Sequence, residues 1–310
     1  MSKWIKNILG LIILVFLVWY LSCHWEQLKA LLKLTPLTLL LLYALICLSR
    51  INISMVNQRL IGALGTKVSL WELYMLQNAT RLLNYLPLRF GTAFRGNYLK
   101  LRYGLSYSYY ASFFIYLMLL TVTVATVSGL VALIAGFGIS GYGNKVLAAL
   151  FLGVIVTSLV LLVLPLPAPS GEGRAKSILR NFLQGRKKVS KNTNIFICTG
   201  HLAISVLIMS VKTSIIYHSL GQRLHPAGYV IIAALAFISS LISLTPGALG
   251  FMEIITASGA MVLGIPLEIG ILAAMLNRAV ELSWIFTVGG ACTAWLWHKH
   301  PAEFKTKSQE

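Results

Sequence analysis

The chain has 310 residues, of which 57% are hydrophobic and 11% are charged, and its mean hydropathy is +0.80. Ordinary globular domains carry about 25% charged residues, so this composition argues against a soluble enzyme and predicts a polytopic membrane protein. The 26 Lys and Arg residues face eight acidic residues, all Glu, for a net charge of +18. Basic cytoplasmic loops explain this excess better than a nucleic-acid partner, so no nucleic-acid binding is expected.

The first predicted element is a spanning helix at about 5–22. It follows Lys3 and Lys6 and ends in Trp19-Tyr20, which suits an interfacial aromatic belt better than a signal-peptide cleavage site. Further spans are predicted at 34–50, 108–137, 146–165, 194–220 and 267–297. With the first, these make about six full spans in an all-α membrane protein.

A repeated pattern of proline and glycine interrupts two further apolar regions, 69–103 and 228–264. Residues 87–91 and 246–250 each begin with Pro and end with Gly, and each is followed by a second Gly at position 104 or 264. The helical pieces on either side are mostly too short to cross a membrane comfortably. Each region therefore fits a re-entrant broken-helix hairpin, with breaks assigned to Pro87, Gly91 and Pro246. Paired breaks of this kind point to a midplane binding site in repeat-built transporters.

Basic residues set the predicted orientation. With the N-terminus in the cytoplasm, the second span returns and places Arg50 inside, and the basic segment 166–193 also falls in the cytoplasm, as does the C-terminus. The two hairpins then enter from opposite sides, as an inverted repeat requires. We expect one integral domain over 1–310, with halves at about 1–165 and 194–310. The linker 166–193 is interpreted as a solvated connector, in preference to a regulatory or headgroup-binding segment.

Polar residues of the first hairpin are candidates for binding phosphate. Gln77, Arg81 and Asn84 share one helix face by their spacing. After the break come Arg89, Arg95 and Arg102. Charge at membrane depth costs about 3 kcal/mol unless it finds water or a partner, and Arg suits bidentate phosphate recognition. The alternative is that these side chains, Arg102 above all, reach to the membrane interface.

The second hairpin and the last span offer further candidates. After the break, the backbone amides of Gly247 to Gly250 begin a half-helix that is able to bind an anion. Glu253, in the first turn, either caps those amides or pairs with an arginine or carries a proton. Arg278 and Glu281 are spaced to pair along one helix, and the alternative partner for Arg278 is Glu253 or a ligand phosphate.

Catalysis and metal binding have little support. Cys23, Cys47, Cys198 and Cys292 are scattered without a CxxC pair, so neither a disulfide framework nor a metal site is expected. A Ser-His-Asp set is excluded because the chain contains no Asp, and no HExxH motif is present. His201 on its apolar helix is interpreted as structural. We expect no enzymatic activity, no cofactor and no metal.

Both breaks resemble the signatures of the lysylphosphatidylglycerol synthase transmembrane (flippase) domain family. The second break follows the family pattern through Pro246, Gly247, Gly250, Glu253, Gly264 and Arg278. The first follows it through Leu86-Pro87, Arg89, Gly91 and Arg95. The resemblance covers nearly the whole chain and implies Arg95, Glu253 and Arg278 as the polar centre. Thr92 stands where the family often has Glu, and Tyr116 lies where it often has a charged pair.

The resemblance implies a flippase or scramblase that moves anionic phospholipid or glycolipid between leaflets of a bacterial inner membrane. The soluble aminoacyl-transferase domain of the synthases is absent from this sequence, so the chain alone is not expected to make lysyl-lipid. Arg81, Asn84, Arg89 and Arg95 are the expected phosphate side of the site. The alternatives are a secondary transporter for a small anion driven by protons through Glu253, and an accessory subunit that holds lipid for a partner synthase or glycosyltransferase.

Overall fold

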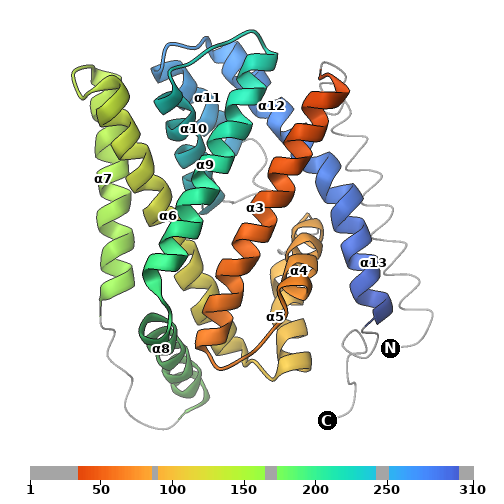
Figure 1. Cartoon of the computed structure of the whole chain (residues 1–310). Helices are drawn as coiled ribbons and strands as arrows, with labels where there is room; N and C mark the ends of the chain where they lie inside the picture. Colours follow the sequence, from red (N-terminus) through yellow and green to blue (C-terminus); the bar gives the residue numbers. More distant parts are fainter. Residues whose placement is uncertain (1–33, 86–89, 165–172, 242–250, 300–310) are drawn as a thin grey trace.

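The computed structural model describes residues 34–85, 90–164, 173–241 and 251–299, which are almost entirely helical and contain no strand. The helices are α3 (Pro36–Ala63), α4 (Leu70–Leu83), α5 (Phe90–Tyr103), α6 (Tyr107–Phe137), α7 (Tyr142–Val163), α8 (Arg174–Asn192), α9 (Ile195–Ser219), α10 (Pro226–Leu241), α11 (Phe251–Val262), α12 (Leu267–Trp284) and α13 (Gly290–Lys299). A π-helical turn, Ile285–Gly289, joins the last two. The all-α prediction is confirmed for these residues (Figure 1).

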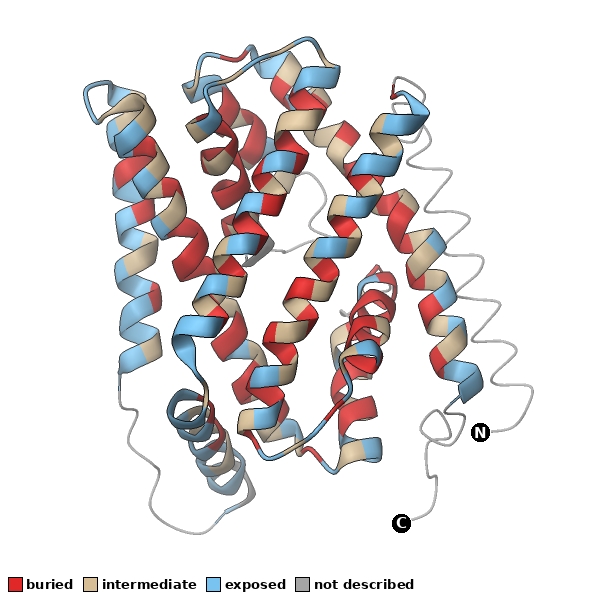
Figure 2. Cartoon of the chain, viewed as in Figure 1, coloured by how far each residue is buried: buried red, intermediate tan, exposed pale blue. Residues whose placement is uncertain are grey.

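In the described part of the chain, five helices are long and apolar enough to cross a membrane: α3, α6, α7, α9 and the continuous α12–α13. Large apolar side chains are exposed on their outer faces, among them Leu37, Val131, Val156 and Leu207. α7, at one edge, is exposed along most of its length (Figure 2). Such contiguous apolar exposure suits contact with lipid tails, and the chain is an integral membrane protein. The predicted span 5–22 lies outside the described residues.

The second span is longer than predicted, which changes the position of Arg50. Thr35 caps the helix by accepting a hydrogen bond from the Thr38 amide, and Pro36 occupies its first turn. The helix then continues past 50 to Ala63, because its polar residues find buried partners instead of ending it. Ser54, for example, donates to Gln77 at 2.9 Å. Arg50 therefore lies near the middle of α3 and not at its C-terminal end.

The first hairpin is held by close contact between α4 and α5. Gly91 lies in the first turn of α5, just after the break, and a Cβ there would stand 2.0 Å from the Thr80 carbonyl oxygen. Asn84 accepts hydrogen bonds from the Thr92 amide at 2.9 Å and its hydroxyl at 3.3 Å. Glycine and asparagine thus bring the two helices together. Pro87 and Arg89 lie outside the described residues.

The second hairpin lies at the opposite end of the bundle from α4 and α5 (Figure 1). Its helices α10 and α11 pack against each other, α10 against α6, and α11 against α12. Gly129 of α6 permits the α6–α10 contact, since a Cβ there would stand 2.8 Å from the Ala234 side chain. Pro246, Gly247 and Gly250 fall outside the described residues.

The linker is more ordered than the predicted solvated connector. Residues 174–192 form α8, which crosses one end of the bundle and packs on α6 (Figure 1). Ser112 of α6 donates to the Phe182 carbonyl at 2.6 Å, and a Cβ at Gly185 would stand 2.7 Å from the Ser112 hydroxyl oxygen. Val189 is fully buried. Apolar side chains at helical spacing make α8 amphipathic. This spacing was not recognised in the sequence because Lys and Arg are so frequent in the segment.

Candidate functional site

A single carboxylate near the middle of the last span collects three cations from three other helices. Lys212 of α9 reaches Glu281 Oε1 at 2.5 Å, and Arg50 of α3 donates to Oε2 at 2.9 Å. Arg81 of α4 lies 3.7 Å from the same Oε2. We call these four residues the Glu281 cluster. It joins helices from both halves of the chain and carries two more positive charges than negative ones.

The cluster is buried in a way that makes its charge costly. The side chains of Arg50 and Lys212 are 7% and 4% exposed, whereas that of Arg81 is 43% exposed. Arg50 Nε is buried and makes no hydrogen bond. A cation at the centre of a spanning helix costs about 3 kcal/mol before partners are counted. Three cations around one carboxylate leave this part of the bundle with an excess of positive charge.

One turn away along α12, Arg278 faces the second hairpin. Its Nε lies 3.9 Å from Glu253 Oε1 of α11, and its guanidinium carbon lies 5.5 Å from the Tyr85 ring centroid. Glu281, which the sequence offered as one partner of Arg278, lies in the cluster with Arg50, Arg81 and Lys212. The alternative partner, Glu253, is the one the structure shows. Glu253 Oε2 is buried and makes no hydrogen bond, so this carboxylate is not saturated.

Arg95 of α5 is a buried cation whose hydrogen-bonding capacity is only partly used. It is 5% exposed, and its Nε and Nη2 are buried without a hydrogen-bond partner. The guanidinium stands 5.3 Å from the centroid of the Phe113 ring of α6, a cation–π contact that offsets only part of its desolvation. Buried polar atoms are nearly always hydrogen-bonded. The orphaned nitrogens of Arg95 therefore suit an anionic acceptor that is not part of the chain.

Other predicted residues of the first hairpin do structural work. Gln77 accepts from Ser54, and the Oδ1 atom of Asn84 is used by Thr92. Arg102 does not simply reach the interface, because its Nε lies 2.7 Å from Glu72 Oε1 of α4. The same carboxylate accepts from Tyr98 at 2.6 Å and from Tyr103 at 2.8 Å. This Glu72 network ties α5 to α4.

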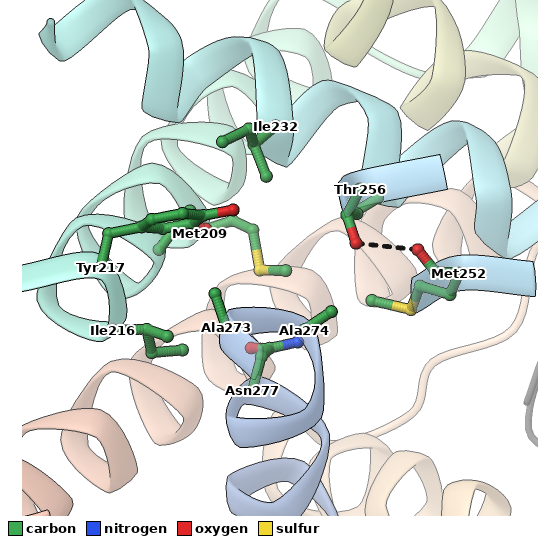
Figure 3. Close-up of a pocket in the computed structure, with 11 residues that line it drawn as sticks. Met209, Ile216, Tyr217, Ile232, Met252, Thr256, Ala273, Ala274 and Asn277 are labelled. Carbon is green, nitrogen blue, oxygen red and sulfur yellow. Dashed lines mark hydrogen bonds between the residues drawn. The ribbon is translucent and has the colours of Figure 1, made fainter. Parts of the chain in front are cut away.

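A mainly apolar cleft lies between α9, α10, α11 and α12 (Figure 3). Thr213 and Thr256 line it, but their hydroxyls donate to carbonyls of their own helices. The Oδ1 atom of Asn277, which also lines the cleft, is buried without a hydrogen bond. Lys212 adjoins Thr213 in sequence, and Glu281 is one turn from Asn277. The cleft and the charges are therefore neighbours on the same two helices.

Sequence reasoning missed Lys212 altogether and misplaced Arg50. Both lie in otherwise apolar helical runs, which is the signal that singled out Arg81 and Arg278. His201 is structural as expected, since its Nδ1 lies 2.7 Å from Asn52 Oδ1 and Asn52 also donates to its carbonyl. No group of three metal-ligating side chains occurs in the residues described above.

Comparison with known proteins assigns the class. A model of the family described as the lysylphosphatidylglycerol synthase TM region matches residues 7–290. The chain belongs to this family, so the predicted membership is confirmed. Membership supports a role related to membrane lipids. No curated protein and no solved structure was found that matches the chain.

Proposed function

We propose that the protein moves anionic phospholipid or glycolipid between the leaflets of a bacterial cytoplasmic membrane. The observation that carries the proposal is the buried positive excess. Among the residues that the structure describes, the buried Arg50, Arg95, Lys212 and Arg278 and the partly exposed Arg81 stand against the carboxylates of Glu253 and Glu281. Such an excess attracts a phosphate and does not suit a neutral headgroup.

The proposed path runs between two re-entrant hairpins in an inverted repeat, α4–α5 and α10–α11. Their positions at opposite ends of the bundle support this arrangement (Figure 1). On the positive-inside rule we assign the end of the bundle that carries the basic α8 to the cytoplasm, and both termini to the same side. A headgroup entering between the hairpins meets Arg95 from one end and the Arg278–Glu253 pair from the other.

Each residue has a defined part in this proposal. Arg95 offers two unsatisfied nitrogens to the phosphate. The 3.9 Å Arg278–Glu253 pair is loose enough to open as the headgroup passes. No catalytic step, cofactor or metal enters the proposal.

The cleft also favours one second candidate, a lipid-holding subunit for a partner synthase or glycosyltransferase. Such a subunit needs the cleft and the cations but not passage between leaflets. A small-anion transporter coupled to protons through Glu253 needs the cations alone. Transport measurements distinguish lipid translocation from the lipid-holding subunit and the small-anion transporter.

The test is headgroup translocation in proteoliposomes with fluorescent phosphatidylglycerol, cardiolipin and neutral phosphatidylcholine. We expect transfer of the two anionic lipids, and loss of that transfer in Arg95→Ala and Arg278→Ala proteins that remain folded. Unchanged transfer in both variants contradicts the proposed site. Absence of transfer by folded wild-type protein contradicts translocation and leaves the holding subunit or the small-anion carrier.

A further inference from the structure

We propose that Glu281 is an internal competitor for the phosphate, and that Arg81 exchanges between this carboxylate and an anionic ligand. The inference rests on the proposed function for its ligand class, a phosphate oxyanion. It assigns a second anion site, separate from Arg95, made of Arg81 and Arg50 beside Glu281.

The first step is the unequal hold of the three cations on Glu281. Lys212 Nζ lies 2.5 Å from Glu281 Oε1, and Arg50 Nη2 lies 2.9 Å from Glu281 Oε2. Arg81 is 3.7 Å from the same Oε2, which is beyond hydrogen-bond distance. A carboxylate oxygen already bonded to one guanidinium is a weaker partner for a second. Arg81 is thus the cation that leaves at least cost.

The second step is accessibility. The Arg81 side chain is 43% exposed, whereas those of Arg50 and Lys212 are nearly covered. A ligand therefore reaches Arg81 first. Arg50 Nε, which is buried and without a hydrogen bond, is a second donor in the same cluster. Two guanidinium groups with unused N–H donors match the several acceptor oxygens of one phosphate.

The third step is the consequence of keeping Glu281 in place. The carboxylate repels a phosphate bound to Arg81 and lowers its affinity, and it takes Arg81 back when the phosphate departs. A carrier needs binding weak enough to permit release. The carboxylate of Glu281 therefore limits the affinity for the phosphate, and removing its negative charge strengthens phosphate binding.

The test measures binding without transport. Purified protein in nanodiscs of neutral phosphatidylcholine is titrated with short-chain phosphatidylglycerol and, separately, with inorganic phosphate. We expect Glu281→Gln to bind the phospholipid roughly tenfold tighter or more, since a unit charge a few ångströms from the phosphate is removed. Arg81→Gln is expected to lose this gain when combined with Glu281→Gln, and Arg81→Lys to keep part of it.

A second variant keeps the proposal testable if Glu281→Gln fails to fold. Glu281→Gln leaves buried Arg50 and Lys212 without their counter-charge, whereas Lys212→Met combined with Glu281→Gln restores the net charge of the cluster. This double variant is also expected to bind more tightly than wild type, because Arg81 has no competitor. Equal or weaker binding by the folded double variant overturns the proposal.

The two ligand arms identify the source of the phosphate. Tighter binding of phosphatidylglycerol alone supports a site reached by a lipid headgroup. Tighter binding of inorganic phosphate as well supports the same site with free phosphate as a ligand. Because the assay contains no translocation step, failure of transport in proteoliposomes does not affect this result, and failure here does not affect the role of Arg95.

Discussion

Two glutamates of this bundle, Glu72 and Glu281, are surrounded in opposite ways. Glu72 is met by one guanidinium and two tyrosine hydroxyls, all from the adjacent helix α5. Glu281 is met by three cations from α3, α4 and α9. The first arrangement is local and balanced in charge, and it holds two neighbouring helices together. The second joins helices that are distant in the chain and carries more positive than negative charge.

The largest expected effect on stability separates the two glutamates directly. Glu281→Gln leaves buried cations without a counter-charge and should lower the free energy of unfolding by about 3–5 kcal/mol, while Glu72→Gln should lose about 1–3 kcal/mol. Thermal unfolding in detergent measures both. Added short-chain phosphatidylglycerol should restore part of the loss in Glu281→Gln only. Equal rescue of both variants contradicts the difference between the clusters.

The contact between α4 and α5 provides the next effect. Gly91→Ala places a Cβ 2.0 Å from the Thr80 carbonyl oxygen and should destabilise the protein by about 1–3 kcal/mol or more. Gly153→Ala in α7, where nothing lies within 4 Å of the new Cβ, is the matched control. If both alanines are tolerated equally in unfolding experiments, α4 and α5 are not packed as described.

Arg95 and Arg102 sharpen the comparison within one helix. Arg95 has orphaned nitrogens, so Arg95→Met should leave the unfolding temperature unchanged or raised, because it removes a buried charge without breaking a hydrogen bond. Arg102→Met removes a partner of Glu72 and should lower the free energy of unfolding by about 1–2 kcal/mol. The loss is modest because Arg102 is partly exposed. The reverse order of stabilities would show that Arg95 is a structural residue.

The smallest effect concerns Asn84. Its Oδ1 atom holds the start of α5 through the Thr92 amide, so Asn84→Ala should lower stability by about 1 kcal/mol. Transfer of lipid per folded molecule should stay near that of wild type. A large loss of transfer at unchanged stability would instead restore Asn84 to the binding residues that the helix spacing suggested.

The sequence predicted the helical class well, because long hydrophobic runs are a local signal. It did not place the end of α3, since buried polar residues such as Ser54 continue the helix only when another helix supplies a partner. For the same reason the Glu281 cluster could not be foreseen. Arg50, Lys212 and Glu281 are far apart in the chain, and only the packing of α3, α9 and α12 shows that they share one carboxylate. The breaks at 86–89 and 242–250 lie outside the described residues, so the predicted roles of Arg89 and Gly247 stay predictions.

The most direct test of the central claim is translocation of phosphatidylglycerol in proteoliposomes by Arg95→Met and Arg102→Met proteins side by side, with phosphatidylcholine as the neutral lipid. The account predicts that Arg95→Met loses transfer of the anionic lipid while remaining folded, and that Arg102→Met keeps it per folded molecule. Equal transfer by the two variants, or transfer of neutral lipid as fast as anionic lipid, would contradict it.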